Sequence, residues 1–183
     1  SAKPAEFEMA LRIPGWARNE AMPTDLYRFL DESREAPVLA VNGQVVPLDI
    51  RDGYARIRRT WKNGDTAQLD LPMPVRRVVA NEAVAEDRDR VALQRGPVVY
   101  AVEGADNGDR VFELVLPDDI VLKAEFRPDL LDGVVAVCGG AANPILAVPY
   151  HVWANRGGGQ MLVWLPRTKA AVRPPKSVNM KVD

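Results

Sequence analysis

Short apolar segments separated by turn-forming residues run along most of the chain. Residues 7–13 place apolar side chains at every second position, which is the period of a strand with one buried face. Just past the middle, residues 91–103 hold two apolar stretches separated by Gln94-Arg95 and Gly96-Pro97, so the second stretch is predicted to be a buried strand that follows a fixed bend. The same criteria predict strands or strand pairs at residues 38–46, 54–61, 66–71, 75–80, 111–116, 121–126, 134–138, 145–148, 152–154 and 161–165. We therefore expect a chain that is mostly sheet.

Turn signals indicate that neighbouring strands pair antiparallel. Asn42-Gly43 lies in the middle of residues 38–46 and supplies the two positive φ angles that a tight type I′ hairpin turn requires. Asp52-Gly53 and residues 62–65 mark two more turns, one on each side of the strand predicted at residues 54–61. Because such short turns join consecutive strands, the first half of the chain is predicted to be an antiparallel meander.

One segment has a helical pattern instead. Thr24 can cap residues 25–33, in which Leu26, Phe29 and Leu30 share one face at the spacing i, i+3, i+4. We predict one short helix at this place.

Residues 104–109 are the clearest linker, since turn formers crowd them and a new series of strands begins at residue 111. The sequence thus predicts an all-β fold of two antiparallel β-sandwich domains, residues 1–103 and residues 104–183. From Arg167 onward the second domain shows little periodicity, and we expect this tail to trail over a surface.

The charge balance and the hydropathy exclude two classes of partner. The 24 basic and 25 acidic residues give a net charge of -1, so there is no basic field for a phosphate backbone and nucleic acid is not expected. No run approaches the ~18–20 apolar residues that cross a bilayer, so a membrane is not expected either. A hydrophobic content of 47% is enough to build a core.

Two features of the sequence bear on the molecular and cellular context of the chain. The chain starts at Ser1 without an initiator Met and reaches its first predicted strand within a few residues, so we expect a piece of a longer protein. The single cysteine, Cys138, cannot form an internal disulfide, which fits a reducing compartment or a fold that needs no cross-link. Localisation stays open, with the cytoplasm favoured on this ground alone.

Residues that could carry catalysis are sparse. A zinc site needs three or four converging ligands, and one His and one Cys offer little, so no metal, cofactor or catalytic residue is predicted. Cys138 closes an apolar strand, where a buried structural thiol is more usual than a nucleophile activated by His151. A catalytic pair among the 25 acidic residues stays open, because distance along the chain does not reveal distance in space. Arg76 and Arg77 are expected to face solvent rather than bind an anion.

Residues 150–156 offer the one surface that could bind a sugar. Tyr150, Trp153 and Arg156 combine aromatic stacking with hydrogen bonding. In an extended strand Tyr150 and Trp153 would point to opposite sides and would not form a flat platform, which favours packing in the core or between domains over sugar binding. The remaining tryptophans, Trp16, Trp61 and Trp164, are expected to plug the core.

Seven short motifs occur in an order that resembles a known family. They are Leu11-Arg-Ile-Pro-Gly-Trp-Ala17, Val41-Asn-Gly43, Gly53-Tyr-Ala55, Trp61 with Gly64-Asp65, Leu71-Pro-Met-Pro-Val-Arg-Arg77, Leu93-Gln-Arg-Gly-Pro-Val-Val-Tyr-Ala101, and Pro149-Tyr150 with Trp153-Ala-Asn-Arg-Gly157. Across about residues 5 to 166, these motifs resemble the C-terminal part of the β-L-arabinofuranosidases of glycoside hydrolase family 127, formerly a domain of unknown function.

The resemblance implies a parent protein with an N-terminal (α/α)6 barrel that carries catalysis, followed by two β-sandwich domains that this chain would supply. In the family a cysteine is the nucleophile beside a zinc held by cysteines and a glutamate, and a second glutamate is the acid/base. That cluster includes adjacent cysteines. This chain has no Cys-Cys pair, so no catalytic or metal residue is carried over, and zinc is expected in the missing catalytic domain.

The chain is therefore expected to be a non-catalytic accessory region that supports the barrel and contributes to assembly, for instance as a homodimer contact. The alternative is a carbohydrate-binding module whose partner is a plant-derived glycan. For the parent, the resemblance implies a retaining glycoside hydrolase acting on terminal L-arabinofuranose or a similar sugar.

Overall fold

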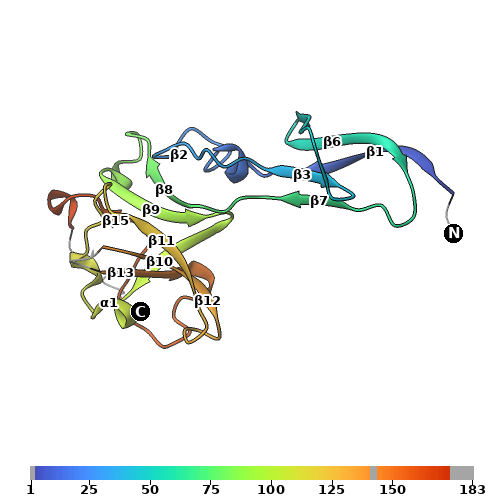
Figure 1. Cartoon of the computed structure of the whole chain (residues 1–183). Coiled ribbons are helices and arrows are strands. Elements are labelled where there is room, and N and C mark those ends of the chain that lie inside the picture. Colours follow the sequence, from blue (N-terminus) through green and yellow to red (C-terminus); the bar gives the residue numbers. More distant parts are fainter. Residues whose placement is uncertain (1–2, 141–143, 174–183) are drawn as a thin grey trace, which may run out of the picture.

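The structure of the chain is a computed structural model that describes residues 3–140 and 144–173 (Figure 1). Most of its regular elements are strands, and every strand pair is antiparallel. The strands are β1 (Ala5–Arg12), β2 (Tyr27–Phe29), β3 (Val38–Val41), β4 (Gln44–Val46), β5 (Ile50–Arg51), β6 (Tyr54–Trp61), β7 (Ala67–Asp70), β8 (Val75–Ala80), β9 (Arg90–Arg95), β10 (Val98–Glu103), β11 (Leu122–Arg127), β12 (Val134–Gly139), β13 (Ile145–Pro149), β14 (Met161–Leu162) and β15 (Leu165–Pro166). The helices are α1 (Gly104–Asn107) and the 3-10 helices η1 (Gly15–Arg18), η2 (Ala85–Asp87), η3 (Val111–Glu113), η4 (Tyr150–Val152) and η5 (Lys169–Ala171). The predicted all-β, sandwich-like fold is confirmed.

The N-terminal part is a thin pair of three-stranded sheets that extends away from the rest of the molecule (Figure 1). One sheet has the order β1-β6-β5 and the other the order β4-β3-β7. β1 and β6 pair over their full length, from Ala5 opposite Trp61 to Arg12 opposite Tyr54. The buried residues of this part are few, with Ile13, Leu39 and Ala55 at the centre of its core.

Two of the three turns predicted in this part are tight hairpin turns with positive φ angles. Asn42 and Gly43 join β3 to β4 with φ angles of 51° and 78°, as a type I′ turn requires. Asp52 and Gly53 join β5 to β6 with φ angles of 53° and 77°. Local turn chemistry therefore fixes these registers.

The C-terminal part is a nine-stranded sheet with the order β11-β12-β13-β10-β9-β8-β2, to which β14 adds beside β10 and β15 beside β9. The apolar segment at residues 91–103 forms its centre as the β9–β10 hairpin, where Arg95 lies opposite Val98 and Gly96 takes a φ of 56°. The sheet curls, so that Leu93 and Val102 from this hairpin share one core with Val137 of β12.

The helix predicted at residues 25–33 is wrong, because residues 27–29 form strand β2 (Figure 1). Tyr27 lies opposite Ala80 and Phe29 opposite Val78, at the open edge of β8. Thr24 does not cap a helix; its Oγ1 accepts a hydrogen bond of 2.9 Å from the Leu26 N–H in a local turn. Backbone pairing with β8 and burial of Phe29 outweigh the helical spacing of the apolar residues.

The sheet does not divide at residue 104, where the sequence predicted a linker. β10 ends at Glu103 and pairs with β13, so that Tyr100 lies opposite Pro149. Residues 104–107 form α1, and the Asn107 side chain both donates to the Leu146 carbonyl, at 2.9 Å, and accepts from the Leu146 N–H, at 3.1 Å. α1 is thus fastened to the same sheet.

Two of the predicted strands are not strands. The apolar residues at 111–116 begin as η3, although Val111 and Leu116 are fully buried. Residues 152–154 belong to η4 and the turn that follows it. Apolar runs this short show that a segment is buried without showing whether it is extended.

The first residues of the tail that begins at Arg167 are attached to the fold, contrary to the expectation that they trail over its surface. Arg167 donates its backbone N–H to the Asp89 carbonyl at 2.9 Å, and its side chain forms an ion pair with Asp118. Ala171 is buried. Residues 174–183 lie outside the described residues. Within the described part, no helix is long and apolar enough to cross a bilayer.

Candidate functional site

Tyr150, the first residue of η4, and Trp153, which directly follows η4, form an exposed aromatic pair. Their ring centroids are 6.2 Å apart and the ring planes are inclined by 16°. The side chains remain 46% and 39% exposed, so neither ring belongs to the core of the described part. A 3-10 helix repeats every three residues, so positions i and i+3 lie on the same side. The expectation that the rings point apart assumed an extended strand and is wrong.

The Arg156 guanidinium is paired with two carboxylates. Its guanidinium forms ion pairs with Glu103 and with Asp106, whose Oδ1 accepts a hydrogen bond of 2.7 Å. The bond to Asp106, and then the one to Glu103, raise the pKa of Arg156 above its ordinary value. The structure therefore brings Tyr150 and Trp153 together, whereas the Arg156 side chain is engaged in ion pairs with Glu103 and Asp106.

This network fixes the loop that carries the rings. Glu103 is only 7% exposed, and it also accepts the Ala154 N–H at 2.8 Å. Ala154 takes a φ of 62°, a left-handed conformation that costs a residue with a Cβ about 1–2 kcal/mol. The Trp153 N–H closes the turn on the Tyr150 carbonyl at 3.1 Å. Sequence inspection missed Glu103, whose one signal is a carboxylate that ends an apolar strand.

The other tryptophans behave largely as expected. Trp61 is buried and stacks on Phe7, with ring centroids 5.7 Å apart. Trp16 and Trp164 are partly buried against the cluster around Phe29. The exposed position of Trp153 therefore distinguishes it from the remaining three.

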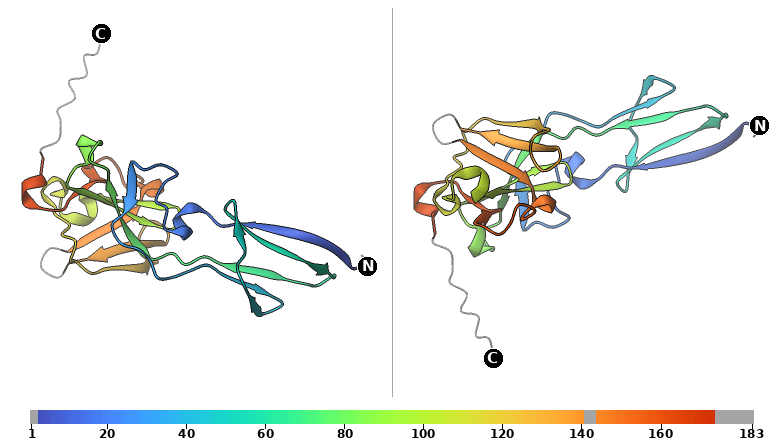
Figure 2. Two further views of the ribbon diagram at one scale, coloured as in Figure 1. Left: turned by 90° about the horizontal axis from the view of Figure 1, so that it is seen from above. Right: turned by 90° about the horizontal axis from the view of Figure 1, so that it is seen from below.

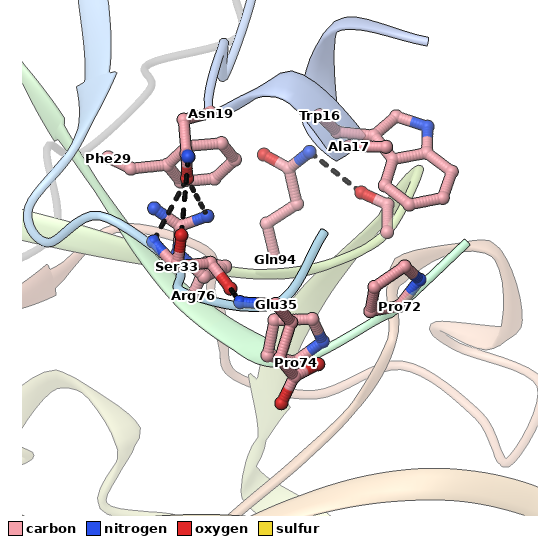
Figure 3. Close-up of a pocket in the computed structure, with 11 residues that line it drawn as sticks. Trp16, Ala17, Asn19, Phe29, Ser33, Glu35, Pro72, Pro74, Arg76 and Gln94 are labelled. Atoms are coloured by element: carbon pink, nitrogen blue, oxygen red, sulfur yellow. Dashed lines mark hydrogen bonds between the residues drawn. The ribbon is translucent and has the colours of Figure 1, made fainter. Parts of the chain in front are cut away.

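A second polar site lies between the two parts, around Arg76 (Figure 3). The Arg76 side chain is only 5% exposed, so the expectation that it faces solvent is wrong. Its guanidinium carbon lies 3.9 Å from the centroid of the Phe29 ring, Nη1 donates to Asn19 Oδ1 at 2.9 Å, and Nη2 donates to the Asp31 carbonyl. Burial lowers the pKa of Arg76, more than the nearby Asp31 raises it.

The cavity beside Arg76 is too small for an organic ligand. It offers about 10 Å³ of space, which is room for roughly one water molecule. Arg77, on the opposite face of β8, is partly buried and donates to the Ile120 carbonyl at 2.5 Å. Both arginines therefore join elements of the fold.

Among the residues that the structure describes, no hydrogen bond joins Cys138 to His151, and no metal site is present. Burial, followed by the charge of Glu125, raises the pKa of the Cys138 thiol, which disfavours the nucleophilic thiolate. Across residues 3–140 and 144–173, no group of three or more His, Cys, Asp or Glu side chains could hold a metal ion. The described residues thus offer no ligand set for a zinc ion, which the resemblance places in the missing catalytic domain.

Two family models match the chain in succession. "Beta-L-arabinofuranosidase, GH127 middle domain" covers residues 1–73, and "Glycoside hydrolase family 127 C-terminal domain" covers residues 75–166. The chain belongs to glycoside hydrolase family 127. The two matches meet where the paired three-stranded sheets give way to the nine-stranded sheet.

Named relatives agree with this assignment. The chain is 30% identical over 195 residues to the "Non-reducing end beta-L-arabinofuranosidase" of Bifidobacterium longum subsp. longum, covering 91% of this chain and 27% of the relative. A solved GH127 beta-arabinofuranosidase matches with a TM-score of 0.87 and 37% identity over 94% of this chain and 30% of its own. The GH127 beta-L-arabinofuranosidase of Geobacillus stearothermophilus T6 matches with a TM-score of 0.74 and 38% identity, over 89% and 27%. The chain thus spans less than a third of each relative.

Proposed function

We propose that this chain is an accessory β-region of a retaining glycoside hydrolase that releases terminal β-L-arabinofuranose, and that it supports the catalytic part and its assembly. The observation that carries the proposal is the match to the middle and C-terminal family models together, in a chain that spans 27–30% of its relatives' length. Catalysis, and the zinc that the resemblance implies, would then belong to the rest of the parent protein.

The construction of the join between the two parts supports a scaffolding role. β2 comes from the sequence of the first part but pairs with β8 in the sheet of the second. Arg76 of β8 binds Asn19 and Asp31 of the first part. Charge-assisted hydrogen bonds are about twice as strong as neutral ones, so those made by the buried Arg76 guanidinium help to hold these segments in one arrangement.

The first experiment compares this chain, the parent enzyme and the parent truncated before this chain on an aryl β-L-arabinofuranoside. We expect no turnover by the chain alone, and we expect the truncated parent to regain thermal stability when the chain is added in trans. Turnover by the isolated chain that disappears when a single carboxylate is replaced would contradict the proposal. So would a truncated parent as stable and active as the full enzyme.

Carbohydrate binding is a second candidate function, favoured by the exposed Tyr150–Trp153 pair. Two nearly parallel aromatic rings on a fixed loop present apolar faces onto which the C–H face of a sugar can stack. The names of the relatives make an arabinose-containing oligosaccharide the first ligand to try.

Isothermal titration of the chain with arabino-oligosaccharides tests this candidate. A dissociation constant tighter than about 1 mM, equivalent to roughly -4 kcal/mol, is expected for a binding module. Trp153→Ala should abolish that binding, whereas Tyr54→Ala, which removes an exposed tyrosine of β6, should not. Absence of heat at millimolar ligand, or equal loss in both variants, would leave support as the sole proposed function.

A further inference from the structure

The chain contains three Asn-Gly pairs, Asn42-Gly43, Asn63-Gly64 and Asn107-Gly108, and each lies in a turn or at a helix end. Asparagine followed by glycine is prone to deamidation, because glycine has no side chain to hinder the approach of its backbone nitrogen to the asparagine side-chain amide. In a folded chain this amide and the glycine N–H must also be free to move. The hydrogen bonds of the three pairs therefore decide which of them can react.

Asn107 is held at both reacting groups. Its Nδ2 donates to the carbonyls of Glu103 and Leu146 at 2.7 and 2.9 Å, and its Oδ1 accepts from the Leu146 N–H at 3.1 Å. The Gly108 N–H, which carries the attacking nitrogen, donates to the Gly104 carbonyl at the end of α1. Attack would break these bonds, so the fold protects this pair.

Asn42 is held by its side chain. Its Nδ2 donates to Asp65 Oδ1 at 2.9 Å, and its Oδ1 accepts from the Thr66 N–H at 2.9 Å. The amide carbon can turn toward the Gly43 nitrogen only after both bonds are broken. This pair is therefore protected although it is exposed.

The Asn63-Gly64 pair differs from the other two. Both residues are exposed, in the turn that joins β6 to β7. Figure 2 shows this turn, in blue-green, at the outer end of the N-terminal part, near the start of β1. Among the residues that the structure describes, none forms a hydrogen bond with the Asn63 side chain or the Gly64 N–H. Gly64 has a φ of 91° and no atom within 4 Å of its Cβ position, so the amide has room to approach.

We propose that Asn63 is a site of spontaneous deamidation in the folded chain, and that the fold protects Asn42 and Asn107. The Gly64 backbone nitrogen attacks Asn63 Cγ and forms a new C–N bond, while the bond from Cγ to the side-chain nitrogen breaks and ammonia leaves with the proton of the Gly64 N–H. Water then opens the cyclic imide at either carbonyl carbon, which gives aspartate or isoaspartate. Water is the sole co-reactant, and nothing is oxidised or reduced. The proposal goes beyond the proposed function and does not depend on it.

Either product changes the turn that connects the two three-stranded sheets. A carboxylate replaces a neutral amide, which adds one negative charge to a chain whose net charge is -1. The new charge lies two positions before Asp65, whose carboxylate accepts from the Lys62 N–H at 2.9 Å. Isoaspartate also lengthens the backbone by one carbon, because the chain then runs through the former side chain.

Incubation of the folded 183-residue chain at mildly alkaline pH, followed by brief trypsin digestion and tandem mass spectrometry, tests the proposal. Trypsin cleaves after Lys and Arg and so separates the three pairs onto the peptides 35–51, 63–76 and 96–110. Deamidation at Asn63 should be at least about tenfold faster than at Asn42 or Asn107, since each of these must first lose at least two hydrogen bonds. Methylation of peptide 63–76 by an L-isoaspartyl methyltransferase identifies the isoaspartate fraction.

The chain unfolded in urea is the matched control, because it keeps the three sequences and removes their hydrogen bonds. There the three pairs should deamidate at similar rates. Equal rates in the folded chain would overturn the proposal. So would an unchanged ratio in urea, which would assign the difference to the neighbouring sequence instead of the fold. Asn63→Ser, with its fold verified by circular dichroism, removes the amide, and a deamidation signal that persists in this variant would also contradict the assignment to Asn63.

Discussion

Arg76 and Arg77 are adjacent in the sequence and have different partners in the structure. Because successive side chains of a strand point to opposite faces, one of two neighbouring arginines on β8 had to face inward. The partners of Arg76, Asn19 and the Asp31 carbonyl, lie 57 and 45 residues away along the chain. Its burial therefore depends on contacts that a local pattern does not reveal.

Replacing Arg76 by methionine should lower the free energy of unfolding by about 1.5–3 kcal/mol, because the charge-assisted hydrogen bonds of the buried guanidinium to Asn19 and to the Asp31 carbonyl are lost. Arg28→Met is the control, since Arg28 is exposed on β2 and should change stability by about 0.5 kcal/mol or less. Urea unfolding followed by tryptophan fluorescence measures both. Equal stabilities for the two variants would show that the Arg76 network contributes no net stability.

Element-scale predictions were right where turn chemistry decided the structure and wrong where neighbouring strands did. Asn42-Gly43 requires a tight hairpin whatever surrounds it, and β3 and β4 pair as predicted. The segment at residues 25–33 satisfied a helical spacing equally well, but β8 offered its open edge. A short segment gains more from completing a sheet than from a single isolated turn of helix.

The contribution of turn residues to stability can be measured at the β9–β10 turn. Gly96 has a φ of 56°, and a Cβ there would approach Met73 Cε to 2.5 Å and Cγ to 2.9 Å. Gly43 has a φ of 78° with no atom within 4 Å of its Cβ position, so Gly43→Ala isolates the backbone strain, about 1–2 kcal/mol.

Gly96→Ala should cost roughly 1–3 kcal/mol more than Gly43→Ala, because Met73 must also move. Thermal unfolding of the two variants measures the difference. Met73→Ala combined with Gly96→Ala should recover part of that excess. If the two substitutions are additive in a double-mutant cycle, the steric explanation is contradicted.

At the scale of the whole molecule, the two regions matched by the family models nearly coincide with the two groups of sheets. One strand of the first region nevertheless belongs to the sheet of the second. β2 lies within the region matched by the middle-domain model and completes the sheet of the C-terminal domain. The boundary predicted at residue 104 rested on a cluster of turn formers, and that cluster folds as α1 against β13. Turn formers mark a change of direction, which happens inside domains as well as between them.

The sequence by itself determined the all-β class, the paired turns and most strand positions, because these depend on alternation and on residues that favour positive φ. Its ordered motifs also determined the family, which the matched models confirm. Tertiary structure alone decided the conformation of η4, the pairing of Tyr150 with Trp153, and the capture of Arg156 by Glu103 and Asp106. The physical reason is that these features depend on β10, α1 and β13 meeting in space, and their side chains are some 50 residues apart in the sequence.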